Sequence, residues 1–413
     1  MNSNLTHTGA PARTWIGALA FLLPCLSLVT LFGVGLVSFL FLGSSFIWFK
    51  PSRDALLRHW PAIRWVVLAF LLHAGFVLAC ALLRGVSMSS VEKPVRMLLA
   101  VSALAVVVAL RAPRRALWWG VSVGAIAALP FVAWQRLGLG LERPGGFINA
   151  ITFGDLALLL GLLSLAGAID LRRHTPQVLL CGAGALAGLL ASLLTATRGG
   201  WIALILAGVL LLRHLRLLDS RRVHLLLAAG VALLAAAWLV PAFGVQARFA
   251  QGVTDIRTWY EGGSVWTNVG TRLELWKGAL MLIREHPLFG LDFGACRARL
   301  AEFAQQGQLD PMVLSLPHLH NDGLQALATG GVAGFAAWAA ILAAPWLFFA
   351  RQIGGGVRAP QFAVALAGML VVLGYLSFGL TEVIFWSMKG SLFYALMVFL
   401  LMGFCLNAKE KIG

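Results

Sequence analysis

The sequence predicts an all-α protein that crosses a membrane many times. Hydrophobic residues make up 60% of the 413 positions, charged residues make up only 12%, and the mean hydropathy is +0.87. Soluble domains carry about 25% charged residues, so this composition excludes a soluble globular protein. The apolar segments are continuous instead of alternating with a period of two residues, which excludes a transmembrane β-barrel.

Twelve apolar segments are the candidate transmembrane helices. Several are shorter than the roughly 20 residues that a perpendicular crossing needs, so their polar flanks must share the span. We expect no cleavable signal peptide, because the apolar run after Arg13 has no clear small-residue cleavage site. The segments cover residues 15–29, 31–48, 63–83, 97–110, 117–134, 147–169, 178–196, 201–212, 225–240, 324–350, 362–380 and 392–406.

These segments divide the chain into three regions. Residues 1–241 would form nine transmembrane helices, residues 242–321 a long polar loop, and residues 322–413 three further transmembrane helices. The five cysteines have no paired spacing, and they therefore predict neither a disulfide framework nor a thiolate metal site.

The distribution of positive charge predicts the orientation. With the N-terminus in the cytoplasm, 18 of the 32 Lys and Arg residues lie on the cytoplasmic side, seven in short outer connections and seven in the long loop. This asymmetry follows the positive-inside rule, so we expect both termini in the cytoplasm and the long loop outside. The basic residues are spread over many inner loops, without a basic helix or an RNA-binding motif, which argues against nucleic-acid binding.

Three arginines in the short outer connections are candidates for binding an anionic ligand. Arg198 stands in the sequence Thr-Arg-Gly-Gly-Trp (residues 197–201), where the glycines let other groups approach the backbone closely. Arg136 and Arg143 flank a second outer turn. The alternative is that each arginine extends its charged end to lipid headgroups.

The long loop contains helical patterns of its own. In residues 270–284, the side chains Leu273, Trp276, Leu280 and Ile283 form one stripe at helical spacing, which predicts an amphipathic helix on the bilayer surface or over the bundle. The sequence Glu-His-Pro-Leu-Phe-Gly would end this helix, and a second would cover about residues 295–306. Seven acidic residues balance the seven basic ones, so we expect a folded cap.

Two histidines stand at the end of the long loop, in the sequence His318-Leu319-His320-Asn321. Imidazole is the side chain best suited to proton transfer near neutral pH, so both are candidates for acid–base chemistry at the membrane surface. The alternative is that they are hydrogen-bonded interfacial residues without a chemical role.

Three of these motifs together resemble the bacterial O-antigen ligase family, within a superfamily that includes O-antigen polymerases and bacterial O-oligosaccharyltransferases. They are the Thr-Arg-Gly-Gly-Trp turn, the Gly-Thr-Arg-Leu-Glu-Leu-Trp helix that runs into His-Pro-Leu-Phe-Gly, and the segment His-Leu-His-Asn-Asp-Gly-Leu-Gln. The motif-level similarity covers about residues 195–330.

The resemblance implies a GT-C-like membrane glycosyltransferase with about 12 transmembrane helices and a large periplasmic helical cap. It would transfer a glycan from undecaprenyl diphosphate to a sugar hydroxyl of the lipid A core. The reaction would take place at the periplasmic face of the bacterial inner membrane. The partners would be the lipid-linked glycan, the lipid A core and the surrounding membrane lipid.

The resemblance also implies roles for individual residues. His320 matches the family's histidine and would act as the general base, with inversion at the anomeric carbon. Arg198 and Arg272 would bind the diphosphate, because guanidinium groups bind phosphate oxygens in pairs and remain charged, and Arg136 and Arg143 are further candidates. From their places in the sequence, further candidates to contact the acceptor or to support the catalytic groups are His318, Asn321, Glu382 and Trp276. His318 could instead only hold the loop.

We expect catalysis without a cofactor or a metal ion. Many glycosyltransferases hold a divalent ion with paired carboxylates, but the sequence contains no Asp-x-Asp, and arginines could replace the charge of the ion. Asp155 lies inside an apolar segment and is costly to bury unpaired, so we expect it to meet an arginine or to take a proton. Glu382 follows the segment 362–380 and could contact the acceptor or orient an arginine.

Several alternative functions remain compatible with the sequence. An O-antigen polymerase would use the same donor but extend another lipid-linked chain, and one dominant outer loop instead of two favours the ligase. A protein O-oligosaccharyltransferase commonly carries a longer C-terminal extension than the short segment after residue 406. A secondary lipid or glycan transporter would place its charges near the membrane midplane, whereas here they gather at one surface.

Overall fold

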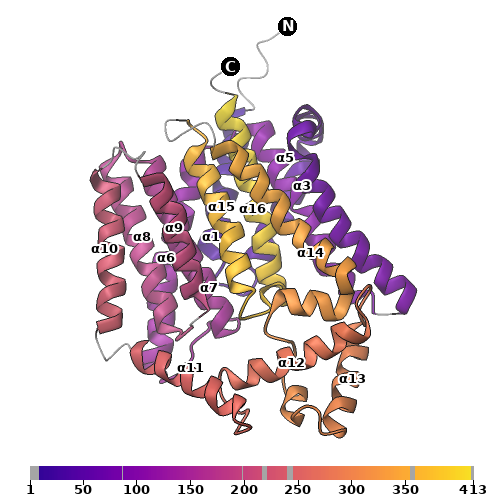
Figure 1. Ribbon diagram of the computed structural model, residues 1–413. Coiled ribbons are helices and arrows are strands. Elements are labelled where there is room, and N and C mark those ends of the chain that lie inside the picture. Colours follow the sequence, from indigo (N-terminus) through magenta and orange to yellow (C-terminus); the bar gives the residue numbers. More distant parts are fainter. Residues whose placement is uncertain are drawn as a thin grey trace.

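The computed structural model describes residues 9–85, 87–197, 199–215, 221–239, 245–353 and 359–410. These residues form helices joined by turns, and no β-strand occurs among them, so the predicted all-α architecture is confirmed. Most helices run side by side between two ends of the molecule, whereas a group of further helices lies at one end (Figure 1). The first helix begins, and the last helix ends, at the opposite end.

The first part of the chain forms six helices of the bundle. Helix α1 (Gly9–Leu26) packs on α6 (Arg114–Ala133), and α3 (Phe49–Arg84) packs on α14 (Asp322–Ile353). Helix α3 is much longer than the predicted segment 63–83, because the polar residues before it are helical as well. The remaining helices of this part are α2 (Gly33–Ile47), α4 (Ser89–Leu99) and α5 (Val101–Leu110).

The centre of the bundle consists of α7 (Ala150–Asp170), α15 (Phe362–Phe378) and α16 (Met388–Lys409), which pack in series. An apolar stretch of 18 residues in α16 is buried completely. This is expected for a helix that is apolar on every side and has other helices around it. Helix α7 packs on α8 (Thr175–Leu194), and α15 packs on α9 (Gly200–Leu215). Helix α10 (Arg221–Leu239) stands at the edge of the bundle (Figure 1).

Every predicted apolar segment overlaps a helix of the bundle. Eight helical stretches among the described residues are long and apolar enough to cross a membrane, and the shorter α2, α9 and α15 are apolar too. The chain is therefore a polytopic membrane protein. The count of 12 spans and the GT-C class stay predictions.

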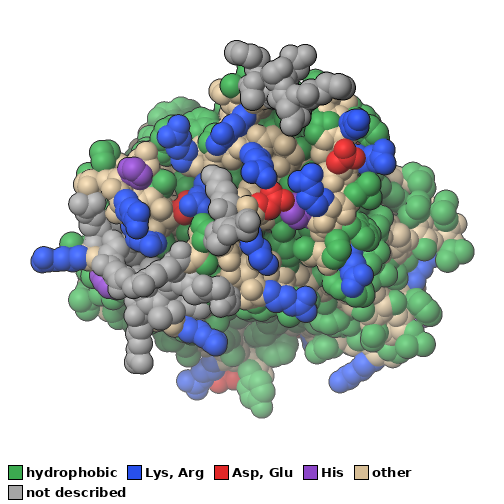
Figure 2. Space-filling view, turned by 90° about the horizontal axis from the view of Figure 1, so that it is seen from above, with side chains coloured by type: hydrophobic (Ala, Val, Ile, Leu, Met, Phe, Trp, Pro, Cys, Tyr) green, Lys and Arg blue, Asp and Glu red, His purple; other side chains and the backbone are tan. Residues whose placement is uncertain are grey.

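The end of the bundle where α1 begins and α16 ends is rich in positive charge. Figure 2 shows many Lys and Arg side chains and few acidic ones on this face. Some of the few acids form ion pairs there: Glu410 pairs with Arg58 and Arg111, and Asp170 with Arg114. The face fits the positive-inside rule if it is cytoplasmic.

The opposite end carries the predicted cap. It consists of α11 (Val245–Tyr260), α12 (Gly270–Glu285), α13 (Phe293–Gln305) and a short 3-10 turn (Pro311–Leu314). Helices α11 and α12 lie across the ends of the bundle helices, and α13 lies on the side of α12 away from the bundle (Figure 1). The cap has an apolar core of its own, in which Leu275 and Leu282 of α12 are buried with Leu300 and Phe303 of α13.

The predicted apolar stripe on α12 requires a correction. Leu280, one of its four members, is half exposed, whereas Leu275, Ala279 and Leu282 are buried in the cap core. Trp276 and Ile283 lie at the edge of that core. The helix has apolar residues around much of its circumference, and the small Gly278 and Ala279 let α13 and the loop after it pack on a face that the stripe did not include.

A short segment ties the cap to the bundle. Helix α14 is broken at Gly331, whose φ of 60° and ψ of −160° are not helical. Residues 287–291, the anchor segment, fit into this break. Val332 N–H donates to Pro287 O at 2.8 Å, Ala333 N–H to Leu288 O at 3.1 Å, and Leu291 N–H to Ala328 O at 3.0 Å. The His-Pro-Leu-Phe-Gly motif thus ends α12 and also joins the cap to α14.

Candidate functional site

The two candidate histidines lie where the cap meets the bundle, at the start of α14. Asn321 caps this helix, since its Oδ1 accepts from Leu324 N–H at 2.9 Å, and its Nδ2 donates to Leu380 O at 3.1 Å. Asp322 Oδ2 accepts from Ile384 N–H at 3.2 Å. The start of α14 is therefore fixed to the connection between α15 and α16.

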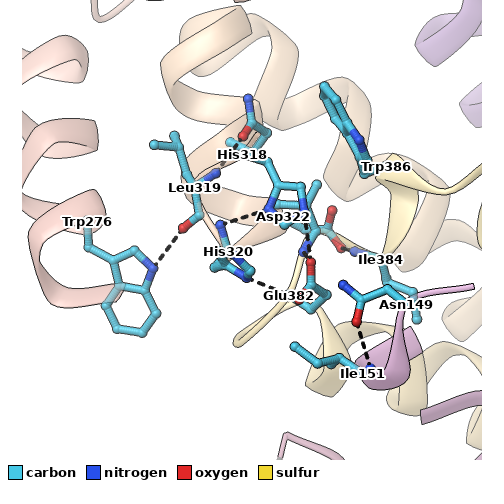
Figure 3. A network of polar contacts seen from close by, with 12 residues as sticks. Asn149, Ile151, Trp276, His318, Leu319, His320, Asp322, Glu382, Ile384 and Trp386 are labelled. Carbon is cyan, nitrogen blue, oxygen red and sulfur yellow. Dashed lines mark hydrogen bonds and ion pairs between the residues drawn. The ribbon is translucent and has the colours of Figure 1, made fainter. Parts of the chain in front are cut away.

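Glu382, in that connection, binds both histidines. His318 Nε2 lies 3.0 Å from Glu382 Oε1, and His320 Nδ1 lies 3.1 Å from Glu382 Oε2 (Figure 3). His320 N–H also lies 3.4 Å from His318 Nδ1. We call Glu382, His318 and His320 the His–Glu cluster. Both ring nitrogens of His318 thus contact other protein atoms. Of the two ring nitrogens of His320, only Nδ1 has such a contact within the described part of the chain.

Glu382 is ionised in this environment. Its side chain is 2% exposed, and burial alone would raise the pKa of the carboxyl group. Hydrogen bonds from His318 and His320, together with the positive charge that an imidazole carries when it is protonated, outweigh burial and lower the pKa to about 2. The carboxylate therefore accepts hydrogen bonds from both imidazoles at neutral pH.

His320 is held in an uncommon backbone conformation. Its φ is 50°, in the left-handed region that non-glycine residues rarely adopt. Leu319, the preceding residue, is fixed on both sides: Trp276 Nε1 donates to its carbonyl at 3.1 Å, and its N–H donates to Gln325 Oε1 at 3.1 Å. Such strain, of order 1–3 kcal/mol, persists only where the surroundings impose it, and it is frequent at functional sites. Trp276 and Asn321 thus support the His320 loop.

Two adjoining cavities open beside this loop. The apolar cavity has a volume of 820 Å³, and the polar cavity has a volume of 430 Å³. Both are lined by Arg143 and Arg272, together with Ile151, Gln251 and Asn268. His320 lines the polar cavity and Arg136 the apolar one. The predicted base and three predicted arginines therefore border one continuous region.

The three arginines come from different elements. Arg272 lies in the first turn of α12, and Arg136 in a π-helical turn, Trp134–Gly138, that follows α6. One guanidinium nitrogen of Arg136, Nη1, is buried and has no hydrogen-bond partner among the described residues. A buried donor without a partner is costly, so it is a ready contact for an anion. The fourth predicted arginine, Arg198, lies outside the described residues.

Asp155 is buried beneath the site, on α7. Neither of its carboxylate oxygens has a hydrogen-bond partner within the described part of the chain. The charges of Arg272 and Glu382 both act on it. Arg272 lies close enough for its charge to act on Asp155, and the pairing of Asp155 with an arginine stays a prediction.

The Thr-Arg-Gly-Gly-Trp turn packs tightly on the same region. A Cβ atom added to Gly199 would lie 2.1 Å from Thr381 Oγ1, and one added to Gly200 would lie 3.2 Å from Asp155 Oδ1. Only glycine permits this approach at Gly199. The turn is thereby placed against Thr381, the neighbour of Glu382, and both Gly199 and Thr381 line the apolar cavity.

The His–Glu cluster has the composition of a three-ligand metal site. One ligand atom from each residue can be chosen so that all three lie within 4.8 Å of one another. A search for paired carboxylates missed this possibility, because the ligands are two histidines and one glutamate from distant segments. Three protein ligands are the number found in catalytic zinc sites. The expectation of metal-independent catalysis therefore needs a direct test.

Sequence reasoning also missed one wall of the polar cavity. Trp266, Thr267 and Asn268 precede α12, and Asp255 belongs to α11. Their spacing matches no catalytic pattern. The sequence offered one signal for this wall, a tryptophan among polar residues just before the amphipathic helix of residues 270–284.

Comparison with known proteins supports a family assignment for part of the chain. Residues 183–339 match the model of the O-antigen ligase family, and this range includes Arg272 and both histidines. This match supports the assignment of that part of the chain to the O-antigen ligase family. A Haemophilus influenzae protein described only as uncharacterized is 21% identical over 332 residues, which cover 80% of this chain and 83% of that protein.

The match supports a membrane enzyme of the O-antigen ligase or polymerase type, with glycan and lipid substrates. Glu382 lies outside the matched range, yet it contacts both histidines inside it. The family segment therefore depends on the C-terminal helices for part of its site.

Proposed function

We propose that this protein transfers a glycan from undecaprenyl diphosphate to a sugar hydroxyl of the lipid A core, on the periplasmic side of the bacterial inner membrane. The observation that carries the proposal is the cavity region bordered by both His320 and Arg272. A proton acceptor and a fixed cation beside one cavity match the two needs of the reaction, deprotonation of a hydroxyl group and stabilisation of a departing diphosphate.

His320 acts as the general base. Its Nδ1–H donates to the Glu382 carboxylate, which leaves the Nε2 lone pair for the acceptor hydroxyl group. The proton moves to Nε2 as the acceptor oxygen attacks the anomeric carbon. The bond from that carbon to the diphosphate oxygen breaks, and undecaprenyl diphosphate leaves with the electron pair. Attack from the face opposite the diphosphate inverts the anomeric centre.

Arginine side chains stabilise the leaving group. Arg272 and Arg143 border both cavities, and Arg136 offers its unpaired buried nitrogen in the apolar cavity. Guanidinium groups bind phosphate oxygens in pairs and stay charged at any physiological pH. The sequence motif adds Arg198 as a further diphosphate ligand. The lipid tail of the donor would occupy the apolar cavity and the adjoining membrane.

The proposal is tested with purified protein, an undecaprenyl-diphosphate-linked glycan and rough lipopolysaccharide, with the product separated by gel electrophoresis. His320→Ala and Arg272→Ala should lower the transfer rate about 10²-fold or more, because each removes a group that acts in the transition state. His286→Ala and Arg257→Ala are the matched controls, since both side chains are exposed in the cap and line neither cavity.

Two outcomes would contradict the proposal. Normal transfer by both site variants would show that the cavity does not carry the reaction. Formation of longer lipid-linked glycans from the donor alone, with no product on lipopolysaccharide, would identify an O-antigen polymerase.

Removal of metal ions tests the role of the His–Glu cluster. We expect transfer to continue unchanged after treatment with EDTA, because the arginines supply the positive charge at the diphosphate. Loss of activity that returns on addition of a divalent ion would instead make His318, His320 and Glu382 metal ligands.

A further inference from the structure

The polar cavity differs from the apolar cavity in chemistry. Its own walls carry His320, Asp255, Trp266 and two threonines, whereas the walls found only in the apolar cavity include Phe249, Val253 and Ile256 of α11. The shared residues Arg143 and Arg272 lie between these two sets of walls. A diphosphate bound by both arginines would therefore have an apolar space on one side and a polar space on the other.

Trp266 is presented to solvent on an ordered loop. Its side chain is 69% exposed, an uncommon position for an indole in a cap that has its own apolar core. Four hydrogen bonds from side chains hold the loop: Ser264 Oγ accepts from Trp266 N–H, Thr267 Oγ1 from Gly270 N–H, Asp255 Oδ2 from Val269 N–H, and Thr271 Oγ1 donates to Val265 O. An exposed aromatic ring on a loop held in this way is suited to stacking against a ligand.

The neighbouring side chains suit a sugar. Asn268 is exposed at the cavity and its amide makes no hydrogen bond within the described part of the chain, so it can both donate to and accept from hydroxyl groups. A pyranose has an apolar C–H face that packs on an aromatic ring and a rim of hydroxyl groups that require such polar partners. The volume of 430 Å³ lies within the range of about 300–1,000 Å³ for small-ligand pockets.

We propose that the polar cavity is the acceptor-saccharide subsite, in which Trp266 stacks on a sugar ring of the acceptor and Asn268 binds its hydroxyl groups. This inference rests on the proposed function, because the base must contact the hydroxyl group that attacks. His320 lines the polar cavity and not the apolar one, so a sugar stacked on Trp266 lies in the same space as the base. The donor diphosphate then approaches from the other side of Arg143 and Arg272.

The test measures initial rates while one substrate is varied and the other is held near saturation. The acceptor is rough lipopolysaccharide, and the donor is an undecaprenyl-diphosphate-linked glycan. Trp266→Ala should raise the KM for the acceptor about tenfold, the equivalent of one aromatic contact, and leave the KM for the donor within about twofold. Trp266→Phe keeps an aromatic face and should restore the acceptor KM to within about threefold.

The matched control is Trp65→Ala, on α3. Trp65 is 60% exposed and lies in a groove with Arg351 and Lys409, far from the His–Glu cluster. The Trp65→Ala variant should leave the KM values for the acceptor and for the donor unchanged. Because Trp266 is exposed, its removal should not unfold the cap, and equal melting temperatures of the variants will check this.

A binding measurement separates this inference from the proposed function. Isothermal titration with the delipidated core oligosaccharide should show binding to the unaltered protein, about tenfold weaker binding to Trp266→Ala, and recovery in Trp266→Phe. This pattern without any glycan transfer would support the subsite and refute the transferase. Transfer with an unchanged acceptor KM in Trp266→Ala would refute the subsite alone. A rise in the donor KM instead would assign the polar cavity to the donor glycan.

Discussion

At the scale of single residues, Glu382 determines what each histidine can do. One carboxylate oxygen faces each imidazole, and the low pKa of Glu382 keeps the group ionised. An ionised carboxylate that accepts from Nδ1–H fixes the tautomer and the ring orientation of His320. His318 contacts Glu382 through Nε2 and the backbone N–H of His320 through Nδ1. Its role in this arrangement is therefore to hold the cluster together.

Replacement of Glu382 by glutamine tests this arrangement. An amide offers one acceptor oxygen and one donor group in place of two acceptor oxygens, so one imidazole must change its tautomer or turn away. We expect Glu382→Gln to lower kcat about 10²-fold, with both KM values changed by less than about threefold. Kinetics with purified protein provides the measurement.

The matched control for this change is Glu285→Gln. Glu285 is a partly exposed carboxylate that pairs with Arg299 in the cap, away from both cavities. It should leave kcat within about twofold, since exposed ion pairs contribute little. A Glu382→Gln enzyme with normal kcat would show that the carboxylate has no role in positioning the base.

The histidines, the arginines and Glu382 could be named as candidates from the sequence, but the pairing of Glu382 with the two histidines could not be predicted. A histidine or an arginine next to glycine and proline residues in a loop is a local sequence pattern that indicates a candidate site residue. Glu382, in contrast, is 62 residues from His320 in the chain, and only the packing of α14 against α15 and α16 brings the two together. Trp266 and Asn268 belong to no sequence motif, and the cavity that they line forms where α11 and α12 pack together.

At the scale of the elements, the break in α14 is the feature with the strictest geometric requirement. A Cβ atom added to Gly331 would lie 2.3 Å from the carbonyl carbon of Leu288, and φ at this position is 60°. The backbone of the anchor segment occupies the space that a side chain would need. Gly331 is therefore required by both conformation and contact.

Gly331→Ala should destabilise the protein and displace the anchor segment. We expect a loss of at least about 2 kcal/mol, because a strained backbone and a backbone clash act together. Thermal unfolding in detergent measures the effect as a fall in the melting temperature.

Gly75→Ala provides the comparison, because Gly75 lies inside α3 with open space around its Cβ position. Alanine is the better helix former there, so this variant should be neutral or more stable by up to about 1 kcal/mol. Equal melting temperatures for the two variants would contradict the requirement at Gly331.

Apolar runs predicted the positions of the bundle helices well, because burial in lipid and protein imposes a long continuous signal. The same signal could not show that α3 begins at Phe49, since its first turns are polar and amphipathic. The buried face of α12 was also misjudged, because the choice among its apolar residues depends on where α13 packs.

At the scale of the whole molecule, charge and site lie at opposite ends. The basic face carries the start of α1 and the end of α16, and the His–Glu cluster lies beside the cap (Figures 1 and 2). This separation is what a transferase needs if its substrates are presented outside the cytoplasm. The assignment of sides rests on the positive-inside rule.

Reporter experiments test the orientation. A fluorescent protein fused to the C-terminus should fluoresce in the cytoplasm, whereas alkaline phosphatase at the same place should be inactive. A peptide tag inserted at Gly307, in an exposed turn after α13, should be accessible from the periplasm in cells with an intact inner membrane. Accessibility of the tag only after the inner membrane is opened would reverse the predicted topology.

The anchor segment restricts how the cap can move relative to the bundle. Swinging α12 and α13 away from the bundle would break three backbone hydrogen bonds to α14, which costs on the order of a few kcal/mol and would disturb the helix that begins at Asp322. A hinged lid is therefore a poor way to admit a long saccharide. The proposed function would then require the lipid-linked glycan to enter laterally past α11, whose Phe249, Val253 and Ile256 border the apolar cavity.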